Sequence, residues 1–132
     1  MPRVGLLVVG HVDPGSVAIA GDYPELFTQL LGPFGVELGA HTVTHPNMEE
    51  LSYSECLLEV EESRDVVASL TGSPVRTFAY PFCKYGDDAK RAVRDAGFDA
   101  AVTCQWRGSW DPFSMKRVMI TGKDGPASFL LK

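Results

Sequence analysis

The chain opens on a continuous apolar run, and this run most restricts the folds available to it. Residues 4–9 read Val-Gly-Leu-Leu-Val-Val, with no alternation of apolar and polar positions. A strand of this kind is apolar on both faces, as in parallel sheets that are covered by helices. Parallel neighbours require crossover connections, which are usually helices. The run therefore predicts an α/β fold.

The rest of the chain repeats an alternation of strands and helices. Helices are predicted at residues 22–31, 53–71 and 88–96, and the first two begin at capping-box patterns. Further strands are predicted at residues 36–40, 75–80, 98–104 and 117–121. Alternating βα units predict right-handed crossovers and a mostly parallel sheet. We expect one domain over residues 1–132, built as a flavodoxin-like three-layer sandwich or as a partial barrel.

Two of the three histidines, His41 and His45, lie four residues apart, directly after the second predicted strand. Two neutral imidazoles can share one divalent ion. The β-branched residues 42–44 and the following Pro46 disfavour a helix. On an ideal strand the two rings would stand about 13 Å apart. The pair can therefore chelate an ion only if the chain turns between Thr42 and His45.

Loops that follow parallel strands emerge at one carboxyl edge of the sheet, where ligands usually bind. His11 and Asp13 follow the first predicted strand, and His41 and His45 follow the second. Histidines with a carboxylate suit zinc or a similar divalent ion that keeps a position open for water. We therefore predict a metal site drawn from His41, His45, Asp13 and His11. The alternative is that the histidines are polar residues satisfied by water or by the backbone.

Composition limits the classes of partner. The 132 residues are 45% hydrophobic with a formal net charge of −5, which argues against a nucleic acid or an anionic membrane as partner. No apolar run approaches the roughly 18 residues of a membrane span, and the N-terminus does not read as a signal peptide. Cys56, Cys83 and Cys104 lack a Cys-x-x-Cys spacing and are interpreted as free thiols. A cytoplasmic protein is the corresponding expectation.

From about residue 35 to residue 129 the chain resembles the polysaccharide deacetylase family, metal-dependent enzymes that remove acetyl groups from chitin-like or peptidoglycan sugars. Residues 37–46 resemble the histidine motif of the family, and residues 75–82 resemble the arginine-bearing strand that walls its active site. Residues 95–103 resemble the next helix-to-strand corner of the family, and residues 111–113 with Arg117 resemble the strand after it. The resemblance implies His41 and His45 as metal ligands, Arg76 as the residue that orients the catalytic base, and an N-acetylated oligosaccharide as partner.

Other parts of the family pattern are missing. The Thr-Phe-Asp-Asp-Gly motif, which supplies the base and the carboxylate ligand, has no counterpart, and no histidine follows His45 to act as general acid. Asp13 would have to serve as base and ligand at once, and Arg76 could equally form a plain salt bridge. General acid–base catalysis contributes roughly 10²–10⁴-fold. We therefore expect a catalytically inactive domain that retains two metal-ligand histidines, with a weakly active zinc-dependent deacetylase as the alternative.

The first 34 residues resemble a different group. Residues 3–13 and 21–27 are similar to the opening βα unit of class I glutamine amidotransferase-like proteins, which have a flavodoxin-like fold. The two resemblances imply a splice near residues 35–39, in an engineered chimera or in a truncated natural gene. Missing βα units would leave a sheet edge exposed, so we expect a monomer or a homodimer through that edge.

Overall fold

The computed structural model describes residues 4–7, 36–104 and 110–117, together with residues 123, 125 and 127. Its strands are β1 (Val4–Leu7), β2 (Val36–Gly39), β3 (Thr77–Ala79), β4 (Ala100–Thr103) and β5 (Met115–Lys116). Its helices are α3 (Tyr53–Thr71), the short 3-10 turn η2 (Pro81–Cys83) and α4 (Asp87–Asp95). The helix predicted at residues 22–31 lies outside the described residues.

All of the described strand pairs are parallel. β1 pairs with β2, and β4 lies between β3 and β5. A bridge between Ala40 and Phe78 joins the two groups, because Ala40 N donates to Thr77 O at 2.9 Å and Ala79 N donates to Ala40 O at 3.0 Å. The five strands therefore follow one another across the sheet in the order in which they occur along the chain.

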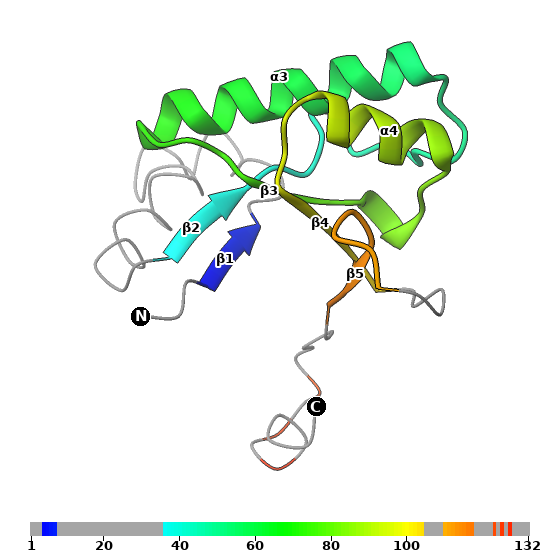
Figure 1. Ribbon diagram of the computed structural model, residues 1–132. Helices are drawn as coiled ribbons and strands as arrows, with labels where there is room; N and C mark the ends of the chain where they lie inside the picture. The colour runs from blue at the N-terminus through cyan, green and yellow to red at the C-terminus, as the bar shows by residue number, and fades with distance from the viewer. Residues whose placement is uncertain are drawn as a thin grey trace, which may run out of the picture.

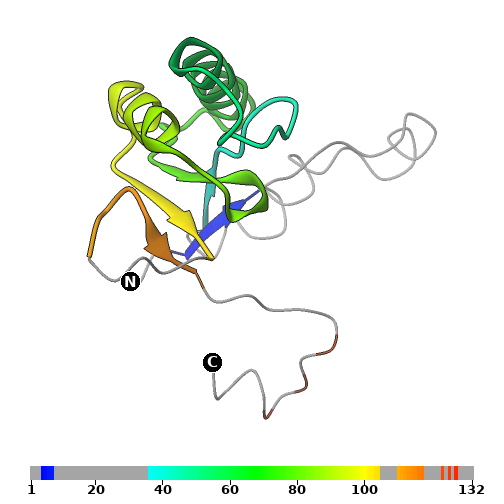
Figure 2. The ribbon, with the colours of Figure 1, turned by 90° about the vertical axis from the view of Figure 1, so that its right-hand side faces the viewer.

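Figures 1 and 2 show that α3 and α4 lie side by side on one face of this sheet. Right-handed crossovers that always advance to the next strand place their helices on the same face. A flavodoxin-like sandwich instead reverses its strand order and covers both faces. Of the two predicted architectures, the described strands and helices have the order of a partial barrel. The prediction of an α/β fold with a parallel sheet is confirmed.

Local signals explain where α3 begins and ends. Ser52 is the N-cap, its side chain accepts from Glu55 N, and the Glu55 side chain accepts from Ser52 N at 2.9 Å, which completes the predicted capping box. Gly72 ends the helix in a left-handed conformation with φ of 64°. The inner face of α3 buries Cys56 and Val60 against the core, whereas Leu70 near its end is 46% exposed.

Aromatic residues of β3 and its neighbours form the centre of the core. Phe78 packs edge-on against Tyr80 and Phe98, and Tyr80 stacks on Tyr85 with ring centroids 4.5 Å apart. The Tyr80 hydroxyl donates to Phe113 O at 2.8 Å, so the segment before β5 is attached to β3. This core includes residues of β3 and β4 and Ala40, which follows β2, so it connects these three strands close to the site.

The last strand differs from its prediction. A strand was predicted at residues 117–121, but β5 is formed by Met115 and Lys116, and residues 118–121 lie outside the described part. Pairing explains the shift, because the register set by β4 places Val102 opposite Met115 and Thr103 opposite Lys116. Arg117 therefore follows β5 and does not open it.

Candidate metal centre

His41 stands at the carboxyl end of β2, where β2 approaches β3 closely. A Cβ atom on Gly39 would lie 2.7 Å from Thr77 Oγ1 and 3.0 Å from Thr77 O, so only glycine allows this approach. Two residues later the side chain of His41 is 7% exposed, and its Nδ1 lies 2.7 Å from Ala79 O. A carbonyl oxygen only accepts, so Nδ1 carries the hydrogen and Nε2 of the neutral ring presents a lone pair.

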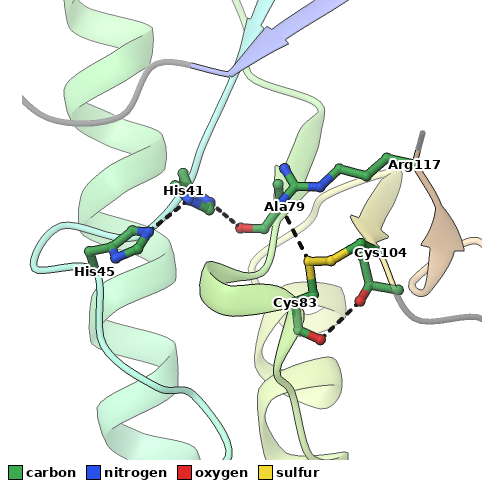
Figure 3. The surroundings of a disulfide bond; sticks show 7 residues. His41, His45, Ala79, Cys83, Cys104 and Arg117 are labelled. Carbon is green, nitrogen blue, oxygen red and sulfur yellow. Dashed lines mark hydrogen bonds between the residues drawn. A yellow bond between two sulfur atoms is a disulfide. The ribbon is translucent and has the colours of Figure 1, made fainter. Parts of the chain in front are cut away.

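The chain turns sharply between the two histidines, as the metal hypothesis requires. Thr42 and His45 both have left-handed backbone conformations, with φ of 67° and 58°. Such conformations are uncommon outside glycine and tend to mark functional sites. The turn brings His45 Nε2 to 3.1 Å from His41 Nε2 (Figure 3), and the two ring centroids are 4.8 Å apart. The two side chains therefore meet, although they are four residues apart.

A carboxylate from α3 stabilises this turn. Glu59 Oε2 accepts from Val43 N at 2.7 Å and from Thr44 N at 3.0 Å, and its Oε1 accepts from Thr44 Oγ1 at 2.5 Å. Burial raises the pKa of Glu59, but the hydrogen bonds from Thr44 and Val43 outweigh burial and leave the pKa below its ordinary value. Glu59 thus stays ionised and positions the residue that follows, His45.

A second strained turn forms the other side of the pair. In η2, Phe82 and Cys83 have φ of 52° and 59°. The Phe82 ring is 60% exposed and lies edge-on to His45, with ring centroids 4.6 Å apart. An exposed aromatic ring in a strained turn, directly beside a histidine pair, gives the site an apolar wall. Neither contact follows from spacing along the sequence, because Glu59 lies in α3 and Phe82 lies in η2, both outside the histidine turn.

The electrostatics favour a neutral imidazole at His41. Burial lowers its pKa from 6.5 to about 4, while the hydrogen bond to Ala79 O opposes this and the charges of His45 and Arg117 add to it. His41 is therefore neutral at physiological pH, which is the form that binds a metal ion.

The histidine pair fits a shared divalent ion. Two Zn–N bonds at a tetrahedral angle would separate the nitrogens by about 3.4 Å, close to the observed 3.1 Å. The Nδ1–H contact to Ala79 O is the outer hydrogen bond that orients a ligating histidine. Among the described residues, no third histidine, cysteine, aspartate or glutamate completes a ligand set. The described part of the chain thus offers two candidate ligands.

The other predicted site residues are placed differently. His11 and Asp13 lie outside the described residues, so their part in a metal site stays a prediction. Arg76 immediately precedes β3, at the opposite end of that strand from Ala79, and forms an exposed ion pair with Asp99 at 3.8 Å. Of the two roles considered for Arg76, the salt bridge is the one that the structure contains.

The prediction of three free thiols was wrong for two of the cysteines. Cys83 and Cys104 form a disulfide, with Cα atoms 5.3 Å apart, and only Cys56 is a free, buried thiol in the described part. Cys104 directly follows β4, and Cys83 ends the turn η2 that follows β3. Because β3 and β4 are parallel neighbours, both side chains reach the same edge. Strand order could have indicated this pairing. Disulfides are rare in the cytosol, so the free-thiol argument for a cytoplasmic location is lost.

Comparison with known proteins supports the family resemblance. Residues 14–101 match the profile of the polysaccharide deacetylase family. The match begins at residue 14 and so includes part of the segment that resembles amidotransferase-like proteins. No curated protein sequence matches the chain. No helix of the described residues is both long enough and apolar enough to cross a membrane.

Several solved structures share the fold. The deacetylase PplD of Streptococcus pyogenes, in complex with acetate, superposes with a TM-score of 0.70 at 21% identity over 82% of this chain and 49% of its own. A polysaccharide deacetylase from Bacillus cereus gives 0.68 at 20% identity, over 82% of this chain and 35% of its own. A CE4 family pseudoenzyme from Bacillus anthracis gives 0.57 at 21% identity, over 75% and 32%. The chain thus spans from about a third to half of the length of these proteins.

Proposed function

The chain belongs to the polysaccharide deacetylase family, and we propose that its histidine pair binds one divalent metal ion while family-type deacetylation is lost. The observation that carries the metal proposal is the 3.1 Å separation of the two Nε2 atoms, with the His41 Nδ1 atom fixed on Ala79 O. Zinc is the first candidate because imidazole suits it. An ion held there would supply Lewis acidity.

The proposed loss of catalysis rests on the chemistry of the groups around the pair. A deacetylase needs a base for water and an acid for the leaving amine. The described groups around the histidines include the Phe82 ring, the Arg117 charge and the Glu59 carboxylate, and Glu59 already accepts three hydrogen bonds from the turn. A carboxylate used in this way is a structural acceptor and a poor base. A pseudoenzyme with the same fold shows that this fold also occurs without the activity.

The second candidate is a weakly active deacetylase of N-acetylated oligosaccharides. The exposed Phe82 ring beside His45 favours it, because sugar rings pack on aromatic faces. In this candidate Asp13 supplies the third metal ligand and also the base, as the sequence analysis predicted. A monomer or a homodimer through an exposed sheet edge remains part of the proposal for either function.

Zinc titration by calorimetry tests the metal proposal. We expect one zinc ion per chain and the loss of this binding in the double variant His41→Ala/His45→Ala. Ser54→Ala, an exposed change at the start of α3, is a matched control that should bind as the unaltered chain does. Equal heats from the unaltered chain and the double variant would refute the metal site.

A deacetylase assay separates the two candidates. An acetylated chito-oligosaccharide with added zinc or cobalt should give no turnover above background if catalysis is lost. Turnover that exceeds background and disappears in Asp13→Ala would instead establish the weakly active enzyme.

A further inference from the structure

The Cys83–Cys104 disulfide joins the turn η2 to the end of β4, at the sheet edge that carries the histidine pair. Cys83 ends η2, and Cys104 directly follows β4. A hydrogen bond from Thr103 Oγ1 to Cys83 O at 3.0 Å supports the same junction. Cys83 is 4% exposed, whereas Cys104 is only half-buried. A small thiol in solution therefore reaches the disulfide from its Cys104 side.

The guanidinium of Arg117 lies against the buried half of this disulfide. Arg117 follows β5, and its backbone N donates to Thr103 O at 2.7 Å, which fixes its position beside the end of β4. Its Nη2 lies 3.6 Å from Cys83 Sγ (Figure 3), and sulfur is a weak acceptor. Its Nε is, among the described residues, the one buried side-chain nitrogen or oxygen without a hydrogen-bond partner. The guanidinium is thus poorly satisfied while the disulfide is intact.

Reduction of the disulfide would give Arg117 a better partner. A cation beside a cysteine favours the thiolate form, and a hydrogen bond to a charged acceptor is stronger than one to a neutral acceptor. In thiol–disulfide exchange, the sulfur that forms the more stable thiolate leaves faster. Solvent access and charge therefore agree, since Cys104 Sγ is the sulfur open to attack and Cys83 Sγ is the better leaving group.

The disulfide also acts on the histidine pair through η2. Phe82 and Cys83 both have left-handed backbone conformations, which residues other than glycine rarely adopt. Such conformations persist only where the surrounding structure holds them. The covalent link to β4 is one such restraint, and η2 places the Phe82 ring edge-on to His45 with centroids 4.6 Å apart. Loss of the link would allow η2 to relax and the ring to move away from His45.

We propose that Cys83–Cys104 is a redox-active disulfide, and that its reduction by a small thiol releases the apolar wall that Phe82 forms beside the histidine pair. A thiolate attacks Cys104 Sγ, the bond between the two cysteines breaks, and Cys83 leaves as a thiolate beside Arg117. A second thiolate attacks the outer sulfur of the mixed disulfide, so that a small-molecule disulfide forms and Cys104 leaves. The two small thiols lose one electron each, one of their protons passes to Cys104, and the other passes to solvent. This inference does not depend on the proposed metal site.

Equilibration of the folded, metal-free chain in glutathione buffers tests the redox activity. Acid quenching, followed by alkylation in denaturant and mass spectrometry, counts the free thiols. Cys56 contributes one throughout, because it is buried and burial raises the pKa of its thiol to about 11. As the proportion of reduced glutathione rises, we expect the count to pass from Cys56 alone to all three cysteines, with an early mixed disulfide on Cys104. Reduction that occurs only when urea unfolds the chain, or a mixed disulfide on Cys83, would overturn the proposal.

Variants at position 117 test the part played by the guanidinium. Arg117→Gln should need a ratio of squared reduced glutathione to oxidised glutathione about 10-fold higher for half reduction, because the hydrogen bond to a charged thiolate is lost. Arg117→Lys keeps the positive charge and should recover part of this change. Lys116→Gln, an exposed change of the same charge one residue earlier, is the matched control and should equilibrate as the unaltered chain does. An unchanged midpoint in Arg117→Gln would refute the role of Arg117.

The ring protons of His45 report the position of Phe82. The aromatic ring lies close enough to shift their NMR resonances, so these resonances should move when the metal-free chain is reduced. Phe82→Leu should be reduced as readily, but its His45 resonances should move much less. His45 resonances that stay unchanged on reduction of the unaltered chain would refute the release of the wall. That result would leave the proposed metal site to be decided by zinc titration of the oxidised chain.

Discussion

The buried imidazole of His41 makes the stability of the fold depend on pH within a definite window. Burial lowers its pKa from 6.5 to about 4. In the unfolded chain the imidazole has its ordinary value, so the unfolded state binds a proton first as the pH falls. This contribution to stability is therefore fully present above about pH 6.5 and is lost as the pH falls towards 4.

The size of the effect follows from the two pKa values. Between about pH 7.5 and pH 4.5, the difference in proton binding integrates to about 2.5 kcal/mol. That is a large part of the roughly 5–15 kcal/mol that stabilises an ordinary domain. His41→Asn has no imidazole to protonate, and its amide can still donate to Ala79 O in place of Nδ1.

Urea unfolding of the metal-free chain and of His41→Asn, at a series of pH values, measures this contribution. Subtracting the variant removes the carboxylates that titrate near the lower end of the window. We expect the advantage of the unaltered chain to fall by about 2.5 kcal/mol across it. Unfolding free energies of the two proteins that stay parallel from pH 7.5 to pH 4.5 would refute the buried, neutral His41 described here.

Three further changes test the supports of the site. Glu59→Ala removes the acceptor that holds the turn between the histidines, so zinc affinity should fall about 10-fold in calorimetry. Gly39→Ala places a Cβ 2.7 Å from Thr77 Oγ1 and should destabilise the fold by about 1–3 kcal/mol in urea unfolding. Cys83→Ser/Cys104→Ser opens a covalent loop with a sequence separation of 21 and should cost about 3 kcal/mol, with no further loss on adding dithiothreitol.

Two of these changes have a matched control variant. Glu62→Ala lies one turn further along α3 on its exposed surface and should leave zinc affinity unchanged. Gly86→Ala adds a Cβ with nothing within 4 Å and should cost less than Gly39→Ala. Zinc affinity unaffected by Glu59→Ala would show that the turn does not depend on its carboxylate. Further loss of stability in the double serine variant on reduction would contradict the disulfide.

Local patterns in the sequence were sufficient for most of the described elements. The capping box of Ser52 and Glu55 and the glycine at position 72 predicted the two ends of α3, because both signals act within one turn of the helix. The position of β5 could not be predicted in this way. Its two residues are strand only because β4 offers them hydrogen bonds, and that pairing depends on the register between separate segments.

The same distinction between local signals and contacts across separate segments applies to the candidate site. Spacing and residue type identified His41 and His45, and the condition that the chain turn between them could be stated in advance. The Glu59 carboxylate that holds this turn and the Phe82 ring beside His45 could not be identified from spacing, because Glu59 comes from α3 and Phe82 comes from the turn after β3. Arg117 was noted only as part of a family resemblance. Its unpaired guanidinium becomes evident once β5 is placed beside β4.

The order of the strands has a consequence for how proteins of this kind can be rebuilt. Since each described strand lies beside its predecessor, a new βα unit can be appended at an outer strand without separating any existing pair. The histidines follow β2 and the Phe82 ring follows β3, so these parts of the site depend on interior junctions of the described sheet, whereas Arg117 follows the outer strand β5. Grafting a unit beside β1 should therefore change the size of the domain while the geometry of the pair is retained.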